Sequence, residues 1–335
     1  MTIEIAANVK HPSAWRASEI GGKEGLTHRL GRDHVAAIEA LLAATRDIPV
    51  CEIGRDSFRD PALDDLMAAA RDAVMHGHGA IILSGLDLSG RSIEDFERIY
   101  WYLGTHLGTA VIQSGKGDLI GHVRHVSDST ARGYLSDMEL GPHTDYHEIL
   151  SLASFRKASR GGQSGLSSAI TVHNEMRRSH PDLLRALYEG YPSGLPARYG
   201  VNEDASDRNV PVYSVMDGEI SAFTLSFYHD AARQRGEALP PKLIEAFGAL
   251  RDIASREDIQ ARFMLEPGEM MFWHNRINFH SRTRFENDPG VERLLLRLWI
   301  EVPDGRPVHP QVAASCEMIG RYHALGLDQR ASAAA

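Results

Sequence analysis

The chain lacks the features of secreted, disulfide-bonded and membrane-spanning proteins. Among its 335 residues only Cys51 and Cys316 are cysteines, and their wide separation argues against a disulfide framework or a cysteine metal site. No apolar run reaches the length of a membrane span, and the N-terminal residues contain no apolar segment of the signal-peptide kind. These absences predict a reducing, cytoplasmic setting.

An excess of positive charge is also missing. The 36 Lys and Arg residues are outnumbered by 45 Asp and Glu residues, which gives a formal net charge of −9. This balance disfavours nucleic acid or an anionic membrane as the main partner. The apolar content of 43% is typical of a chain that buries a sizeable core, so we expect a folded globular protein.

No internal repeat is visible, and the apolar patterning predicts helices and strands mixed along the sequence. Apolar spacing and capping residues predict helices at Asp33–Ala44 (with Asp33 as the cap), Pro61–Met75, Ser92–His106, Pro181–Glu189 and Pro240–Ser255. Short β-type runs occur at Gly79–Gly85 and repeatedly from Ala261 onward. The pattern indicates an α+β protein with a helical lead-in over residues 1–60, a main body over 61–310 and a C-terminal extension over 311–335.

The run RLLLRLWIEV, Arg293–Val302, alternates with the period of a strand. Leu294, Leu296, Leu298 and Ile300 would share one face, and Arg293, Leu295, Arg297 and Trp299 would share the other. If the leucine face packs under helices, Arg293 and Arg297 point into the protein. An unpaired buried cation costs several kcal/mol, so each of these arginines needs an anion.

The stretch GPHTDYHE, Gly141–Glu148, carries two histidines and a carboxylate within five positions. In an extended backbone His143 and Asp145 project to the same face and can hold one cation. A short His-x-Asp pair also arises by chance, so this stretch alone leaves an ordinary polar segment open. His280, which follows an apolar β-like run, offers a third ligand. Two imidazoles and one carboxylate are typical of non-haem Fe(II) oxygenases.

Other histidines near these positions are weaker candidates. His147 would lie ~13 Å along an extended strand from His143, too far to share a metal, so we expect a residue behind the site or an exposed one. His122 and His125 would need a helix to converge on a metal, and their segment is predicted to be extended. We expect those two at the surface or in a lid.

Four motifs together resemble the taurine dioxygenase and clavaminate synthase-like group of Fe(II)- and 2-oxoglutarate-dependent oxygenases. They are HTD at 143–145, GGQSG at 161–165, PGEMMFWHNRINFHSRT at 267–283 and RLLLRLW at 293–299. The resemblance covers roughly Gly79–Pro307. It implies a double-stranded β-helix, or jelly roll, flanked by helices.

The resemblance also implies roles for individual residues. Fe(II) would be held by His143, Asp145 and His280, with O2 and 2-oxoglutarate as co-substrates. Arg293 would bind the distal carboxylate of 2-oxoglutarate, which matches the planar fork of a guanidinium. Ser164 would assist at the same carboxylate.

Substrate contacts are predicted around Arg297 and the loop Ser129–Gly141. Arg297 would bind an anionic group of the substrate or, alternatively, a protein carboxylate at the barrel rim. Tyr134 and Asp137 would meet the substrate from the loop, for which a plain surface loop is the competing interpretation.

The implied reaction converts 2-oxoglutarate to succinate and CO2 and hydroxylates an unactivated C–H bond in a small molecule. Because Asp145 is a carboxylate, halogenation is disfavoured, whereas desaturation and ring closure stay open. Two other classes also stay open: a zinc hydrolase that uses the HTDYH stretch, and a non-catalytic jelly-roll binding protein. The sequence indicates neither the substrate nor the oligomeric state.

Overall fold

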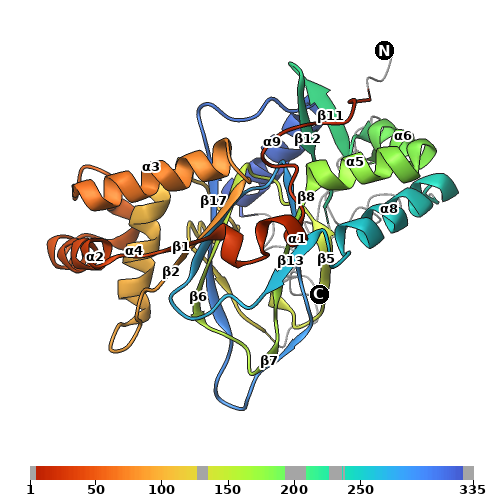
Figure 1. Cartoon of the computed structure of the whole chain (residues 1–335). Coiled ribbons are helices and arrows are strands. Elements are labelled where there is room, and N and C mark those ends of the chain that lie inside the picture. Colours follow the sequence, from red (N-terminus) through yellow and green to blue (C-terminus); the bar gives the residue numbers. More distant parts are fainter. Residues whose placement is uncertain (1–4, 127–134, 193–208, 226–235, 237, 327–335) are drawn as a thin grey trace.

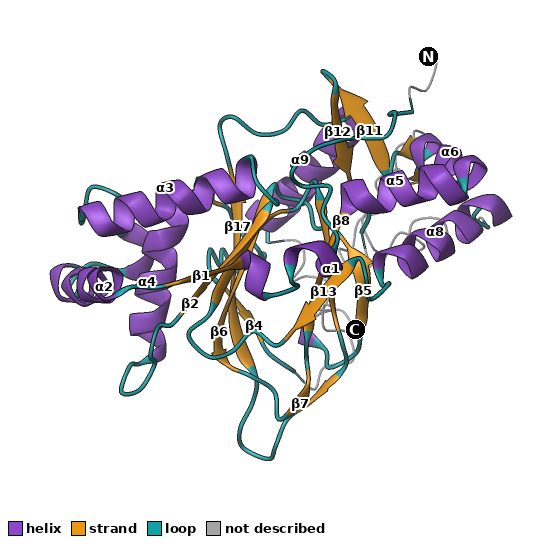
Figure 2. Ribbon diagram, in the orientation of Figure 1, coloured by secondary structure: helices purple, strands orange, loops and turns teal. Residues whose placement is uncertain are grey.

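The computed structural model describes residues 5–126, 135–192, 209–225, 236 and 238–326 (Figure 1). Two β-sheets face each other and enclose an apolar layer that includes Leu150, Leu166 and Phe263. Helices cover the outer face of each sheet (Figure 2). This is the jelly-roll core flanked by helices that the sequence predicts.

The larger sheet has seven strands in the described part of the chain. Their order is β1 (Thr27–Arg29), β2 (Ala80–Ser84), β14 (Met270–His274), β6 (Ile149–Arg156), β17 (Leu294–Glu301) and β3 (Thr109–Ala110), with β4 (Gly121–Val123) also paired to β17. The predicted strands at Gly79–Gly85 and Arg293–Val302 are therefore confirmed as β2 and β17. The lead-in is not purely helical, because its strand β1 pairs in parallel with β2 at the sheet edge.

The smaller sheet carries the other half of the barrel wall. Its order is β13 (Gln260–Phe263), β8 (Ser164–Ser168), β15 (Asn278–Arg282) and β5 (Leu140–His143). Three short ribbons accompany it: β7 (Arg160–Gly161) with β16 (Phe285–Glu286), β9 (Tyr191–Pro192) with β10 (Asn209–Val210), and β11 (Tyr213–Met216) with β12 (Glu219–Ala222).

Strand β17 shows why the sequence folds in this way. Leu296 and Leu298 pack into the cluster beneath the helices, whereas Leu295 and Trp299 belong to the layer between the sheets. Arg297 alternates with these inner residues and therefore points into the barrel. The predicted two-faced strand is confirmed.

The helices of the described residues include all five predicted segments, with ends that differ by at most one residue, and three helices that the sequence patterns do not predict. The helices are α1 (Ala17–Ile20), α2 (Arg32–Ala44), α3 (Pro61–Met75), α4 (Ile93–Thr105), α5 (Ala169–Ser179), α6 (Pro181–Glu189), α8 (Pro241–Ala254) and α9 (Pro310–Ala324), with 3-10 turns at Glu24–Leu26 and Val50–Glu52. Ser92 and Asp95 form the predicted capping box of α4. The predicted cap of α2 is wrong: Gly31 precedes the helix, its N–H donates to His34 Nδ1 at 3.0 Å, and Asp33 lies within the first turn.

The helices cover the two sheets from opposite sides. Helices α2, α3 and α4 lie on one side of the barrel and α5, α6 and α8 on the other (Figure 1). Helix α9 packs Val312 and Ile319 against Tyr146, which lies next to Asp145 in the chain. The C-terminal extension is thus part of the wall around the predicted metal ligands.

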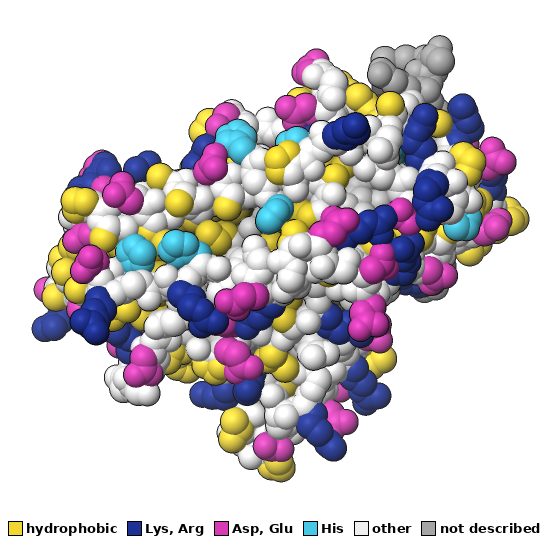
Figure 3. All heavy atoms as spheres, viewed as in Figure 1, with side chains coloured by type: hydrophobic (Ala, Val, Ile, Leu, Met, Phe, Trp, Pro, Cys, Tyr) yellow, Lys and Arg dark blue, Asp and Glu magenta, His cyan; other side chains and the backbone are white. Residues whose placement is uncertain are grey.

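The visible face of the molecule carries basic and acidic side chains interspersed over its whole extent (Figure 3). Among the described residues, the helices are all too short or too polar to span a bilayer.

Candidate active site

Antiparallel pairing of β5 with β15 brings two predicted ligands together. His143 ends β5 and stands opposite His280 in the strand register, with ring centroids 4.1 Å apart. Ligand atoms of His143, Asp145 and His280 all lie within 4.8 Å of one another. The folded chain thus assembles the three ligands predicted from distant parts of the sequence.

Asp145 reaches this site from a bend, not from a strand. The sequence is compatible with an extended backbone through His143 and Asp145, but β5 ends at His143 and a bend precedes β6. Asn275 fixes the bend: its Oδ1 accepts from the backbone N–H of Asp145 at 3.1 Å, and its Nδ2 donates to the carbonyls of Asp145 and His147 at 2.8 and 2.7 Å. Because these backbone groups are satisfied by a side chain, they need no partner strand.

The protonation states of the three side chains suit a divalent metal. The Nδ1 of His143 lies 2.7 Å from the carbonyl of Gly141, which can only accept, so the lone pair of this imidazole is on Nε2. Burial lowers the pKa of His280 to about 3, which keeps its ring neutral. Burial acts to raise the pKa of Asp145, but the imidazoles, Arg297 and a hydrogen bond from Trp299 outweigh it and hold the pKa below the ordinary value. Two imidazoles and a carboxylate are the donor set expected for non-haem iron.

Arg293 is a buried cation, and none of the described residues supplies it with an anion. Its side chain is 3% exposed, and in the described part of the chain Nη1 has no hydrogen-bond partner. Burial, reinforced by repulsion from Arg282, lowers the pKa of Arg293 to about 9. The guanidinium lies over the ring of Phe285 at 5.0 Å. A buried guanidinium of this kind is a receptor for an anionic ligand.

The GGQSG motif shapes the wall beside Arg293. Gly161 and Gly162 have φ of 67° and 72°, and a Cβ at Gly162 would lie 3.5 Å from Arg293 Nε. A Cβ at Gly161 would meet the carbonyl of Arg284 at 2.0 Å, so only glycine fits there. Ser164 follows on β8, buried and opposite Arg282 in the register.

Arg297 lies close to the three predicted metal ligands. Its Nε donates to Gln113 Oε1 at 2.7 Å, and Gln113 Nε2 donates to the Arg297 carbonyl, also at 2.7 Å. Its Nη1 is 3.9 Å from Oδ2 of Asp145. Gln113 therefore fixes the guanidinium beside the metal site.

Asp137 belongs to a segment that is held from inside the barrel. Arg282 donates from Nη2 to the carbonyls of Ser136 and Met138 at 2.7 and 2.5 Å, and the N–H of Phe285 donates to the Asp137 carbonyl at 3.1 Å. Tyr134, the other predicted loop contact, lies outside the described residues.

The remaining histidines are separate from the ligand cluster. His147 is buried, its Nδ1 lies 3.2 Å from Glu301 Oε1, and its ring packs 5.0 Å from that of Trp299, so it is a residue behind the site, not an exposed one. His122 is exposed and pairs with Glu97 at 2.7 Å, as a surface residue would.

Sequence reasoning missed four residues that support the site: Gln113, Asn275, Arg282 and Trp299. Each is buried and bonded to a part of the chain far from it in sequence. The sequence feature that could have indicated them is a polar side chain inside or next to an apolar strand. Such a side chain is buried and therefore needs hydrogen-bond partners.

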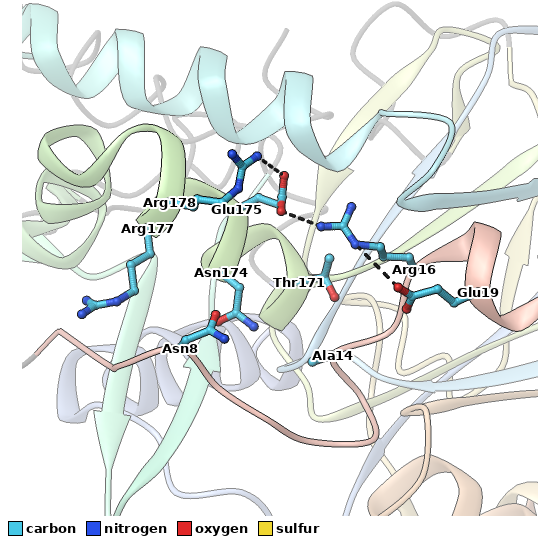
Figure 4. A pocket seen from close by; sticks show the side chains of 9 residues that line it. All are labelled: Asn8, Ala14, Arg16, Glu19, Thr171, Asn174, Glu175, Arg177 and Arg178. Atoms are coloured by element: carbon cyan, nitrogen blue, oxygen red, sulfur yellow. Dashed lines mark hydrogen bonds and ion pairs between the residues drawn. The ribbon is translucent and has the colours of Figure 1, made fainter.

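A cavity of about 550 Å³ lies between the N-terminal segment and α5 (Figure 4). Glu175 is its centre and is bonded by Arg16 at 2.5 Å, Arg178 at 3.0 Å and Arg256 at 2.7 Å. Arg16 and Arg256 also pair with Asp258. We call Arg16, Glu175, Arg178, Arg256 and Asp258 the Glu175 cluster; its charges satisfy each other and join the N-terminal segment to α5.

Comparison with known proteins agrees with this geometry. The model of the family described as taurine catabolism dioxygenase TauD, TfdA matches residues 44–299. FR-33289 synthase of Streptomyces rubellomurinus (strain ATCC 31215) is 28% identical over 309 residues, which cover 88% of this chain and 90% of that protein. Uridine-5'-phosphate dioxygenase of an Amycolatopsis species is 26% identical over 183 residues, covering 54% and 66% respectively.

A similar fold occurs in the solved structure of asparagine oxygenase in complex with Fe(II), 2S,3S-3-hydroxyasparagine and succinate. The TM-score is 0.64 at 18% identity, with 82% of this chain and 93% of that chain covered. The chain belongs to the TauD/TfdA family and is a 2-oxoglutarate-dependent non-haem iron dioxygenase.

Proposed function

We propose that this dioxygenase hydroxylates an unactivated C–H bond in a small anionic substrate, of amino-acid or natural-product type. One observation carries the proposal: Arg293, a buried guanidinium to which no described residue supplies an anion, shares the barrel interior with the cluster of His143, Asp145 and His280. The first feature suits the carboxylate of a keto acid, and the second suits iron.

Each residue has a distinct task in this proposal. His143, Asp145 and His280 would hold the metal, which when bound would supply the oxidative chemistry on 2-oxoglutarate and on the C–H bond. Arg293 binds the distal carboxylate of 2-oxoglutarate, with Ser164 assisting. The buried position of Ser164 on the wall near Gly162 supports that role.

Arg297 is proposed to bind the anionic group of the substrate. Its Nε donates to Gln113 and its Nη1 lies 3.9 Å from Asp145 Oδ2, so an anion bound by this guanidinium would lie next to the metal ligands. Asp137, and Tyr134 from the neighbouring loop, would contact other groups of the substrate. The names of two similar proteins mention hydroxyasparagine and uridine-5'-phosphate, both of which carry anionic groups.

The test is succinate formation from 2-oxoglutarate with Fe(II), ascorbate and O2. We expect turnover by the wild type, its loss in His143→Ala, and its retention in His122→Ala, because His122 is an exposed histidine outside the site. Hydrolysis that proceeds with zinc and without O2 would instead indicate a hydrolase. Bound metal and 2-oxoglutarate without any succinate would indicate a binding protein.

Candidate acids would then be screened for acceleration of 2-oxoglutarate consumption. Hydroxylation adds one oxygen atom to the substrate, whereas desaturation and ring closure remove two hydrogen atoms. Mass spectrometry of the accelerated reaction therefore distinguishes these outcomes. Acceleration only by cationic compounds would contradict the proposed role of Arg297.

A further inference from the structure

The two oxygen atoms of Asp145 have different surroundings. Oδ1 lies 4.0 Å from His143 Nε2, the nitrogen that carries the lone pair. Oδ2 accepts a hydrogen bond from Trp299 Nε1 at 3.1 Å and lies 3.9 Å from Arg297 Nη1. The carboxylate is therefore oriented, with one oxygen toward the other ligands and one toward Trp299.

Trp299 is itself held firmly. It is 4% exposed on the inner face of β17, and the guanidinium of Arg297 lies 4.3 Å from its ring. The ring of His323, from α9, stacks at 6.0 Å with an interplanar angle of 23°, and the ring of His147 lies 5.0 Å away. An indole packed by three neighbours has little freedom to rotate, so its N–H is fixed in direction.

We propose that Trp299 is a positioning residue of the metal site. Its indole N–H holds Oδ2 of Asp145 and thereby presents Oδ1 as the single metal-facing oxygen of this carboxylate. Asp145 lies outside the strands, so no hydrogen bonds to a neighbouring strand fix its position. Asn275 holds its backbone instead, and Trp299 holds its carboxylate. This role rests on the metal site proposed above and adds a residue from outside the ligand set.

The chain contains a matched control in Trp273. Trp273 and Trp299 both pair with Leu150, one from β14 and the other from β17, so they occupy the same row of the inner face. Trp273 is also near the ligands, with its ring 5.1 Å from that of His280. In the described part of the chain its Nε1 has no hydrogen-bond partner. Replacing it removes an equal indole without removing a bond to Asp145.

The experiment measures binding of Co(II), without 2-oxoglutarate or substrate, to wild type, Trp299→Phe, Trp273→Phe and His143→Ala. We expect the dissociation constant of Trp299→Phe to rise about 10- to 100-fold, the range found when an outer partner of a metal ligand is removed. Its d–d absorption spectrum should change as well, because the freed carboxylate can offer both oxygens. Trp273→Phe should bind Co(II) within about threefold of the wild type, a change well below that range.

Equal effects of Trp299→Phe and Trp273→Phe would overturn the proposal. If Trp299→Phe does not fold, 3-benzothienylalanine at position 299 decides the question, since it keeps the ring shape and lacks the N–H. Wild-type binding and an unchanged spectrum in that variant would equally overturn it. His143→Ala separates the two proposals: if it binds Co(II) as well as the wild type, the metal site itself is wrong, whatever Trp299 does.

Discussion

The arginines of the Glu175 cluster and the buried Arg293 differ in whether the described part of the protein supplies a carboxylate to pair with them. In the Glu175 cluster, Arg16, Arg178 and Arg256 converge on the carboxylate of Glu175, and Arg16 and Arg256 also pair with Asp258. Inside the barrel, Arg293 is more deeply buried than any of them but has no carboxylate in bonding distance among the described residues.

This difference teaches how to separate structural from functional cations. A charge whose partners are all in the protein contributes to stability, and its removal is felt in folding. A buried charge without a partner lowers stability until a ligand supplies the anion, so it is retained for binding. The same residue type therefore has two roles, which its neighbours reveal.

The largest expected effect is on 2-oxoglutarate binding by Arg293→Ala. Removing one partner of a buried ion pair costs about 3–5 kcal/mol, so the dissociation constant should rise by roughly two to three orders of magnitude. Calorimetric titration with 2-oxoglutarate checks this. Arg293→Lys should give a smaller loss because it keeps the charge and loses the fork. An unchanged dissociation constant for 2-oxoglutarate in Arg293→Ala would contradict the view that this unpaired arginine serves ligand binding.

Arg16→Ala is expected to have a smaller effect, and to lower the stability of the fold instead of weakening 2-oxoglutarate binding. This change removes bonds at 2.5 and 2.6 Å to Glu175 and Asp258, while Arg256 still pairs with both. Since Arg16 is partly exposed, the free energy of unfolding should fall by about 1–2 kcal/mol. Urea denaturation measures it, with Arg177→Ala as control because Arg177 lines the same cavity but, among the described residues, bonds only a backbone carbonyl. A fall in 2-oxoglutarate affinity with no loss of stability would contradict the structural role.

The Glu175 cluster also predicts a dependence of stability on pH. Burial acts to raise the pKa of Glu175, but hydrogen bonds from Arg178, Arg256 and Arg16 outweigh it and lower the pKa to about 2. A depressed pKa in the folded state means that the stabilisation is complete above about pH 4.5 and is lost as the pH falls toward 2. Glu175→Gln should therefore be less stable than the wild type at neutral pH, with the difference shrinking over that window. A constant difference from pH 6 down to about 2 would be inconsistent with this linkage.

The smallest effect is expected for Lys157→Ala. Lys157 pairs with Glu266 at 2.8 Å, and both side chains are nearly half exposed. Exposed pairs contribute about 0–1 kcal/mol, so the unfolding free energy should change by less than 1 kcal/mol. Thermal denaturation tests this at low and at moderate salt. A loss of unfolding free energy equal to that of Arg16→Ala would show that the exposed Lys157–Glu266 pair contributes as much stability as the partly buried pairs of the Glu175 cluster.

Local patterns were sufficient to predict most of the fold. Proline at the first turn and glycine after the last predict α6 as Pro181–Glu189 with Gly190 behind it, which the structure has. Alternation predicts both faces of β17. These features depend on neighbours within a few residues, so they can be read from one segment of chain.

The bend at Asp145 could not be predicted in that way. It depends on Asn275, which lies far away in the sequence and satisfies the backbone of the bend from the side. The same reason applies to Trp299, whose periodicity indicates an inner position but not the carboxylate that its N–H meets. The metal ligands could be predicted from their motifs, whereas the orientation of their side chains depends on contacts between distant segments.

The pairing of β5 with β15 has a consequence for the scaffold itself. Strand β5 is the outermost strand of its sheet, and His143 stands at its end opposite His280. An ion bound by both imidazoles would fasten this edge to its neighbour, and ligand binding to the folded state alone adds to its stability. Removal of the iron by a chelator should thus raise the rate of amide hydrogen exchange along Leu140–His143 before the rest of the barrel opens. Exchange at this edge would therefore indicate loss of iron.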